Sequence, residues 1–221
     1  MRKFILPACL FFCSFLVKAQ ESKWSVSFTP AIVQRPGLRY GIQPGFEYKL
    51  NDRLSVLTEI AFTAGNSKDS SYSASCYFRI KPELRYTLFQ TRGGFDVYTG
   101  LQFSYSYRKW KDLNGGNYFD KELYSDSTIS YTRAGIRSPV FTSSLQFGAL
   151  IPIGNHFNID FFIGMGVRTI FTDYSGVENA NKEQYNRAIC KIVPVSDPAY
   201  WINGTVTRFH SNLGIRFLYR F

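Results

Sequence analysis

The closing stretch TVTRFHSNLGIRFLYRF, residues 205–221, decides the fold of this chain. Every second side chain towards its end is apolar or aromatic: Leu213, Ile215, Phe217, Tyr219 and Phe221. The residues between them are mostly basic, polar or small. A period of two over this length predicts an extended strand whose faces meet different surroundings. In a membrane barrel those surroundings are lipid outside and a polar lumen inside.

The same alternation recurs along the chain and predicts seven further strands at residues 23–33, 39–50, 54–63, 75–86, 95–108, 138–151 and 157–170. The connections 51–53, 87–94 and 152–156 are short, 64–74 is intermediate, and 108–137 and 171–203 are long. The short connection 34–38 breaks this alternation of lengths. The expected fold class is all-β, an eight-stranded antiparallel up-and-down transmembrane β-barrel with short periplasmic turns and longer extracellular loops.

The first residues favour export. Arg2 and Lys3 precede an apolar run over residues 4–17, and the small Ala19 follows shortly afterwards. This layout predicts a cleaved signal peptide at 1–19 and an outer-membrane β-barrel domain at 20–221. The run is too short for a spanning helix, which needs about 20 apolar residues, and no other stretch approaches one. A barrel is then the remaining way to span, and the expected location is the bacterial outer membrane.

The charge of the chain bears on its binding partners, and its cysteine content bears on disulfide formation. The formal net charge is +10, and removal of the three cations at residues 2, 3 and 18 leaves +7. These charges are spread along the chain rather than clustered, so we expect no nucleic-acid binding. Cys9 and Cys13 leave with the signal peptide, and only Cys76 and Cys190 remain. A disulfide between them and two free thiols are both open.

Aromatic residues are placed where strands meet the short turns: Trp24, Tyr48, Tyr86, Phe95, Tyr219 and Phe221. Such rings favour the headgroup level of a membrane. The residues Tyr40, Phe62, Phe78, Tyr105 and Phe141 are candidates for a second girdle at the opposite end. A soluble β-barrel, with its apolar face turned inward, is the alternative.

Three segments carry a resemblance to a known family: Lys18-Ala19-Gln20, residues 80–86 (IKPELRY) and residues 214–221 (GIRFLYRF). They resemble the small eight-stranded outer-membrane β-barrel domain proteins of Gram-negative bacteria. The resemblance implies partners in outer-membrane lipid and lipopolysaccharide. It also implies that Tyr219 and Phe221 form an assembly signal for the barrel-assembly machinery. Many unlike functions share this pattern.

An eight-stranded barrel is just wide enough for its own side chains to fill it. The inward positions predict a lumenal ion-pair network of Glu47, Glu59, Arg79, Glu83, Arg85, Asp96, Asp160, Arg168, Arg208 and Arg216. Lys81 and His210 lie on the same faces. Simple folding of neighbouring strands can place Arg85 opposite Asp96, and Glu59 opposite Arg79. The alternatives are a gated ion path and a substrate-binding lumen.

One local string bears on catalysis. His210-Ser211 resembles part of the site of outer-membrane lipid A deacylases, but adjacent residues of a strand point to opposite faces. No acidic residue follows Ser211, so a nucleophile with a base in reach is not expected. His156 stands alone in a turn, and no metal or cofactor site is expected.

The long connections carry the candidates for binding: Trp110, Tyr118, Phe119, Tyr124, Tyr131 and Trp201. Exposed aromatic residues among charges suit an extracellular or envelope protein or glycan ligand. Alternatively, these rings pack on one another and shelter the barrel mouth. The expected function is structural or surface-binding, without catalytic activity. A small channel, an accessory barrel for protein secretion and a lipid A-modifying enzyme are the alternatives.

Overall fold

The computed structural model describes residues 23–33, 39–65, 72–91, 95–120, 127–184 and 202–221, and these residues form an all-strand, predominantly antiparallel sheet. The prediction of an all-β chain is confirmed. The strands are β1 (Trp24–Val33), β2 (Arg39–Lys49), β3 (Leu54–Gly65), β4 (Tyr72–Gln90), β5 (Asp96–Asp120), β6 (Ser127–Ile153), β7 (Phe157–Glu178), β8 (Asn181–Gln184) and β9 (Ile202–Arg220). The predicted signal peptide lies outside the described residues.

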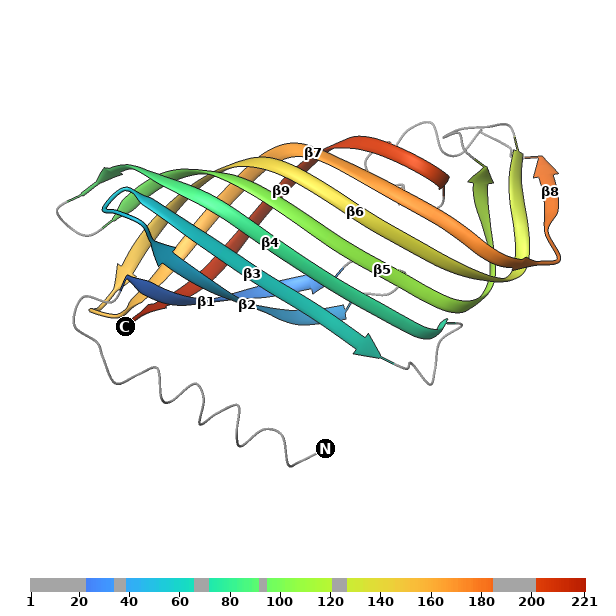
Figure 1. Ribbon diagram of the computed structural model, residues 1–221, viewed down its shortest axis with the longest axis horizontal. Coiled ribbons are helices and arrows are strands. Elements are labelled where there is room, and N and C mark those ends of the chain that lie inside the picture. The colour runs from blue at the N-terminus through green and yellow to red at the C-terminus, as the bar shows by residue number, and fades with distance from the viewer. Residues whose placement is uncertain (1–22, 34–38, 66–71, 92–94, 121–126, 185–201) are drawn as a thin grey trace, which may run out of the picture.

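Strand pairing follows the chain order and then returns to its start. Antiparallel ladders join β1 to β2, β2 to β3, and so on to β7, and β7 pairs with β9. β9 also pairs with β1, with Ser25 opposite Arg220 and Phe28 opposite Phe217. Following the ladders from neighbour to neighbour therefore leads from β1 back to β1. The strands run steeply tilted across one another in Figure 1.

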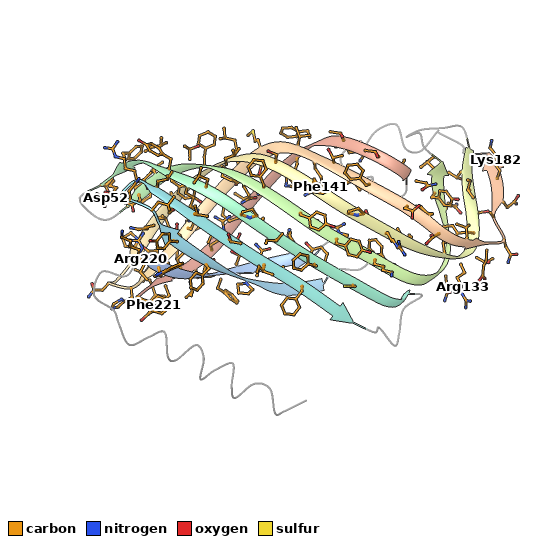
Figure 2. All side chains as sticks on the ribbon, in the orientation of Figure 1. Asp52, Arg133, Phe141, Lys182, Arg220 and Phe221 are labelled. Atoms are coloured by element: carbon orange, nitrogen blue, oxygen red, sulfur yellow. The ribbon has the colours of Figure 1, made fainter. Side chains whose placement is uncertain are left out.

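Tight turns gather at one end of the sheet. In the turn between β2 and β3, the Oδ1 atom of Asn51 accepts hydrogen bonds from the backbone N–H groups of Arg53 (2.9 Å) and Leu54 (2.8 Å). Asn51 thus holds the turn through its own side chain. Figure 2 shows Asp52, Arg220 and Phe221 at this end, and Arg133 and Lys182 at the opposite end.

The two faces of the sheet differ sharply. Burial alternates residue by residue along the first half of β7, where Asp160 and Phe162 are buried while Phe161 and Ile163 are exposed. On β9, Leu213 is 83% exposed, whereas Arg216 is fully buried. The apolar face therefore points outward and the polar face points inward. The soluble alternative, which needs the reverse arrangement, is wrong.

Strands β5, β6 and β7 extend beyond the others at the end opposite the tight turns (Figure 1). The predicted long loop at 108–137 is wrong, because β5 continues to Asp120 and β6 begins at Ser127. The register shifts between Trp110 and Leu113, and again between Arg133 and Gly135. Such irregularities leave a residue unpaired and disturb the alternation of faces, so they interrupt the period of two that revealed the other strands.

The second predicted long loop, 171–203, is partly strand as well. β7 continues to Glu178, and β8 pairs with the start of β6, Asn181 opposite Ser130. Residues 185–201, including Cys190 and Trp201, lie outside the described residues, as does Tyr124. Cys76 is an exposed free cysteine on β4.

The far end of β5 folds back towards β9. Phe119 lies opposite Ile202 and Asp120 opposite Asn203, in a parallel pairing. Both Phe119 and Ile202 are buried. The outer parts of β5 (109–120), β6 (127–137) and β7 (173–178), together with β8, are called the outer extension below.

Candidate functional site

The candidate site is a buried network of charges on the inner face of the sheet. Arg216 of β9 is its centre and has no exposed surface. Its Nη1 atom lies 2.9 Å from Asp160 Oδ2, its Nη2 atom 2.8 Å from Glu83 Oε2, and its Nε atom 3.3 Å from Glu59 Oε2. One guanidinium thus joins carboxylates from β7, β4 and β3. Short charge-assisted contacts of this kind are the strong ones.

Arg85 of β4 forms a second centre. Its Nη2 atom lies 2.7 Å from Asp160 Oδ2, its Nε atom 2.9 Å from Glu83 Oε1, and its Nη1 atom 3.3 Å from Glu47 Oε1. Asp160 and Glu83 are therefore shared between the two arginines. The sharing explains how two guanidinium groups can be buried in one interior without leaving a carboxylate unpaired.

Aromatic rings cover both guanidinium groups. The Arg216 guanidinium carbon lies 3.9 Å from the centroid of the Phe162 ring, and that of Arg85 lies 4.6 Å from the centroid of Tyr98. The Tyr98 hydroxyl donates to Asp160, 2.9 Å from its Oδ1. The rings add cation–π attraction and exclude water from the ion pairs.

Lys81 completes the charged layer. Its Nζ atom lies 3.0 Å from Glu59 Oε2, and the Thr29 hydroxyl donates a hydrogen bond to Glu59 Oε1. The cations Lys81, Arg85 and Arg216 thus face the four carboxylates Glu47, Glu59, Glu83 and Asp160. The charges nearly cancel, which is the condition for burying them.

A layer of amides continues the network. Gln102 Nε2 donates to Glu83 Oε2 at 2.7 Å, and Gln146 Nε2 lies within hydrogen-bond reach of Gln102 Oε1 (3.2 Å) and Ser144 Oγ (2.8 Å). Asn212 accepts from Gln146 at 3.3 Å. The interior is crossed by continuous hydrogen bonding from strand to strand at this level.

The structure brings together Glu47, Glu59, Glu83, Arg85, Asp160 and Arg216 of the predicted network. Both predicted pairings are wrong, because Glu59 lies opposite Lys81 rather than Arg79, and Arg85 lies opposite Gly100 rather than Asp96. Asp96 instead lies 4.0 Å from Arg220, near the tight turns. β4 continues to Gln90, so the turn lies further along the chain than the predicted 87–94, and Arg85 pairs four residues beyond Asp96.

The other predicted cations lie apart from this network. The guanidinium carbon of Arg79 lies 5.7 Å from the centroid of the Tyr77 ring, and that of Arg108, which does not belong to the predicted network, lies 5.6 Å from the same centroid. Arg168 lies opposite Arg208 on the neighbouring strand, and its Nη2 atom is 3.3 Å from the Nε2 atom of His210. His210 is half-buried, whereas its neighbour Ser211 is exposed.

Four of the predicted binding aromatics are among the described residues, and these four, Trp110, Tyr118, Phe119 and Tyr131, lie in the outer extension and are buried. Tyr118 stacks on Tyr174 with the ring centroids 4.1 Å apart, and the Tyr131 centroid is 5.9 Å from that of Tyr174. Trp110 is part of the same cluster, which also includes Ala134 and Ile136. This set is called the aromatic cluster below. Trp110, Tyr118, Phe119 and Tyr131 are each at most 7% exposed, so of the two alternatives the structure favours mutual packing.

Several network residues escaped the assignment made from sequence: Tyr98, Gln102, Ser144, Gln146, Phe162 and Asn212. Their signal was alternation alone, since each lies at an inward position of its strand. Within the described ranges, no group of three or more histidine, cysteine and acidic side chains is placed to hold a metal ion. The same ranges contain no helix long and apolar enough to cross a membrane.

Comparisons with known proteins add little. No family model matches the chain, and no curated protein matches it. Among solved structures, the crystal structure of Neisserial surface protein A superposes with a TM-score of 0.41 at 13% sequence identity, over 90% of this chain and 98% of that one. This likeness is too low to support an argument about function.

Proposed function

We propose that this chain is an integral outer-membrane barrel of eight strands, closed by the pairing of β1 with β9, which neither conducts ions nor catalyses a reaction. It acts as a structural or surface-binding protein of the envelope and presents the outer extension above the membrane. β8 belongs to that extension rather than to the barrel wall. The proposal rests on the face pattern, with apolar side chains outward on every wall strand and a buried ionic network inside.

The outward face supports the membrane assignment. Large apolar side chains are exposed on it from every wall strand, for example Phe46, Phe62, Phe103, Phe147 and Phe161. Soluble monomers rarely expose contiguous apolar patches of more than a few hundred Å². In a bilayer the same rings contact acyl chains, so they are not exposed to water.

The interior supports the closed, non-conducting assignment. Arg85 and Arg216, with their shared carboxylates, leave fully buried charges across the lumen rather than a water-filled path. A conducting barrel needs a continuous aqueous channel, which wider barrels provide and an eight-stranded one does not. The small-channel alternative keeps no specific support from the described residues.

Planar-bilayer recording tests this proposal. The protein is refolded in detergent, and folding is checked by a different gel mobility before and after boiling. Heat-modifiable protein inserted into a bilayer is expected to give no unitary conductance. Discrete conductance steps would contradict the plugged lumen, and identical mobility of boiled and unboiled samples would contradict the barrel itself.

A further inference from the structure

Two cations face each other on the outward side of the outer extension. Lys109 of β5 lies directly opposite Arg137 of β6 in the ladder. Arg137 is exposed and Lys109 is partly exposed. Within the described residues, neither makes an ion pair shorter than 4.0 Å. Like charges directly opposite one another destabilise a sheet, so this outer basic pair needs a compensating anion or a reason of its own.

The aromatic rings next to the outer basic pair indicate where the pair lies relative to the membrane interface. Tyr107 and Pro139, one outward position closer to the tight turns, lie opposite each other, and Tyr105 and Phe141 follow. The Tyr105 and Phe141 ring centroids are 4.9 Å apart. Outward aromatic rings favour the headgroup interface, and two residues along a strand advance it by about 7 Å. The pair therefore lies just beyond the aromatic level, where headgroup phosphates are found.

Two grooves meet at the outer basic pair. One, of about 360 Å³, is lined by the side chains of Tyr107, Pro139 and Phe171 and by the charged Arg137 and Asp173, among others. The other, of about 330 Å³, lies further out and includes Lys109, Arg133 and again Arg137. The first offers apolar walls on the membrane side, and the second offers cations above it. This order matches an amphiphile whose anionic group is uppermost.

The neighbouring carboxylates offset the charge of the pair only in part. Asp173 lies opposite Arg137 on β7, and it is exposed. Further out, Arg133 is already engaged by Glu178, with Nη1 and Oε1 3.7 Å apart. Around the two grooves the cations still outnumber the carboxylates.

We propose that Lys109 and Arg137 bind a phosphate group of an outer-leaflet glycolipid of the lipid A type, with its acyl chains against the apolar wall below. This inference rests on the proposed function, since it requires the outer extension to face the outer leaflet. Two cations near a membrane surface contribute roughly thirty-fold to the affinity for an anionic lipid.

Native mass spectrometry of the refolded protein with added lipid tests the site. The probes are bisphosphorylated lipid A, the same lipid with its phosphates removed, and inorganic phosphate as a competitor. The double variant Lys109→Gln/Arg137→Gln is compared with Arg53→Gln/Lys182→Gln, which removes the same charge from the exposed tight turn and from β8. All proteins must first show heat-modifiable mobility, so that failure of the barrel is recognised separately.

Wild type and the matched control are expected to retain bisphosphorylated lipid A. The Lys109→Gln/Arg137→Gln variant is expected to bind it roughly thirty-fold more weakly, and wild type should lose a similar factor with the dephosphorylated lipid. Inorganic phosphate should not displace the lipid. Equal binding by both double variants, or displacement by phosphate alone, would overturn the proposal.

Discussion

At the scale of single residues, Arg216 shows what holds the interior together. Its guanidinium contacts three buried carboxylates and the face of Phe162. Burial of an ion pair is weak evidence for stability by itself, because desolvation opposes the attraction. Removal of one partner is a different matter, because the remaining charges stay buried without compensation.

Arg216→Met is therefore expected to lower the free energy of unfolding by about 3–5 kcal/mol. The loss arises because Glu59, Glu83 and Asp160 lose a shared cation while remaining inside. Urea titration of the protein refolded into lipid vesicles, followed by tryptophan fluorescence, measures it.

The matched control is Arg133→Met. Arg133 and Glu178 form an ion pair at 3.7 Å, with side chains 52% and 56% exposed, so its loss should cost roughly 0–1 kcal/mol. Equal effects of the two substitutions would show that the buried network contributes no more than a surface pair.

At the scale of elements, the outer extension carries its own core. The rings of Tyr118 and Tyr174 stack there, and Trp110 and Tyr131 pack beside them. This core lies beyond the ionic network, at the end where β5, β6 and β7 extend further than the other strands (Figure 1). The outer extension should therefore be able to unfold locally while the strands that form the wall stay folded.

Tyr118→Ala is expected to make the outer extension sensitive to protease while the barrel stays folded. The substitution removes the stacked ring and leaves a cavity beside Tyr174, at a cost of about 3–5 kcal/mol to the extension. Limited proteolysis of refolded protein, read alongside boiled and unboiled gel mobility, measures both parts. Asn117→Ala, at the exposed neighbouring position, is the control and should leave the cleavage pattern unchanged.

The elements also show where inference from sequence works. Strands with an unbroken period of two, such as β7 up to residue 170 and β9, are predicted because opposite faces meet opposite surroundings. The outer halves of β5 and β6 are not predicted, because the shifts at Trp110/Leu113 and Arg133/Gly135 interrupt the period. Inward charges such as Asp160 and Arg216 can be identified, but their partners cannot, since register depends on where each turn lies and β4 continues to Gln90, beyond its predicted end at residue 86.

At the scale of the whole molecule, the wall depends on a short seam. β1 and β9 pair only from Ser25–Arg220 to Phe28–Phe217, whereas β7 and β9 pair from Phe157–Tyr219 to Thr172–Gly204. A closed barrel has no free strand edge, so this seam is what separates a closed wall from an open sheet.

A disulfide engineered across the seam checks closure. With Cys76 and Cys190 changed to serine, the pair Val26→Cys/Tyr219→Cys is expected to cross-link under mild oxidation. Val26 and Tyr219 are ladder partners, and the Cα separation of such partners falls within disulfide range. Non-reducing gels of boiled protein should show a faster-migrating, looped form.

The control pair is Val26→Cys/Phe157→Cys. Phe157 lies opposite Tyr219 on the far side of β9, two strand spacings of about 4.8 Å from Val26, so its cysteine is out of reach. A seam pair that cross-links no better than this control would mean that β1 and β9 are not joined in solution.

The parallel pairing of Phe119 and Asp120 with Ile202 and Asn203 has a consequence for the order of events during folding. β9 follows every other described strand along the chain, and its first residues secure the outer extension while its last residues complete the wall. Attachment of the outer extension and closure of the wall therefore depend on the same strand, and its contacts with β1 and β5 span long sequence separations that slow their formation. An assembly intermediate in which β9 has not yet docked should therefore have an open wall and an outer extension that is not held by β9.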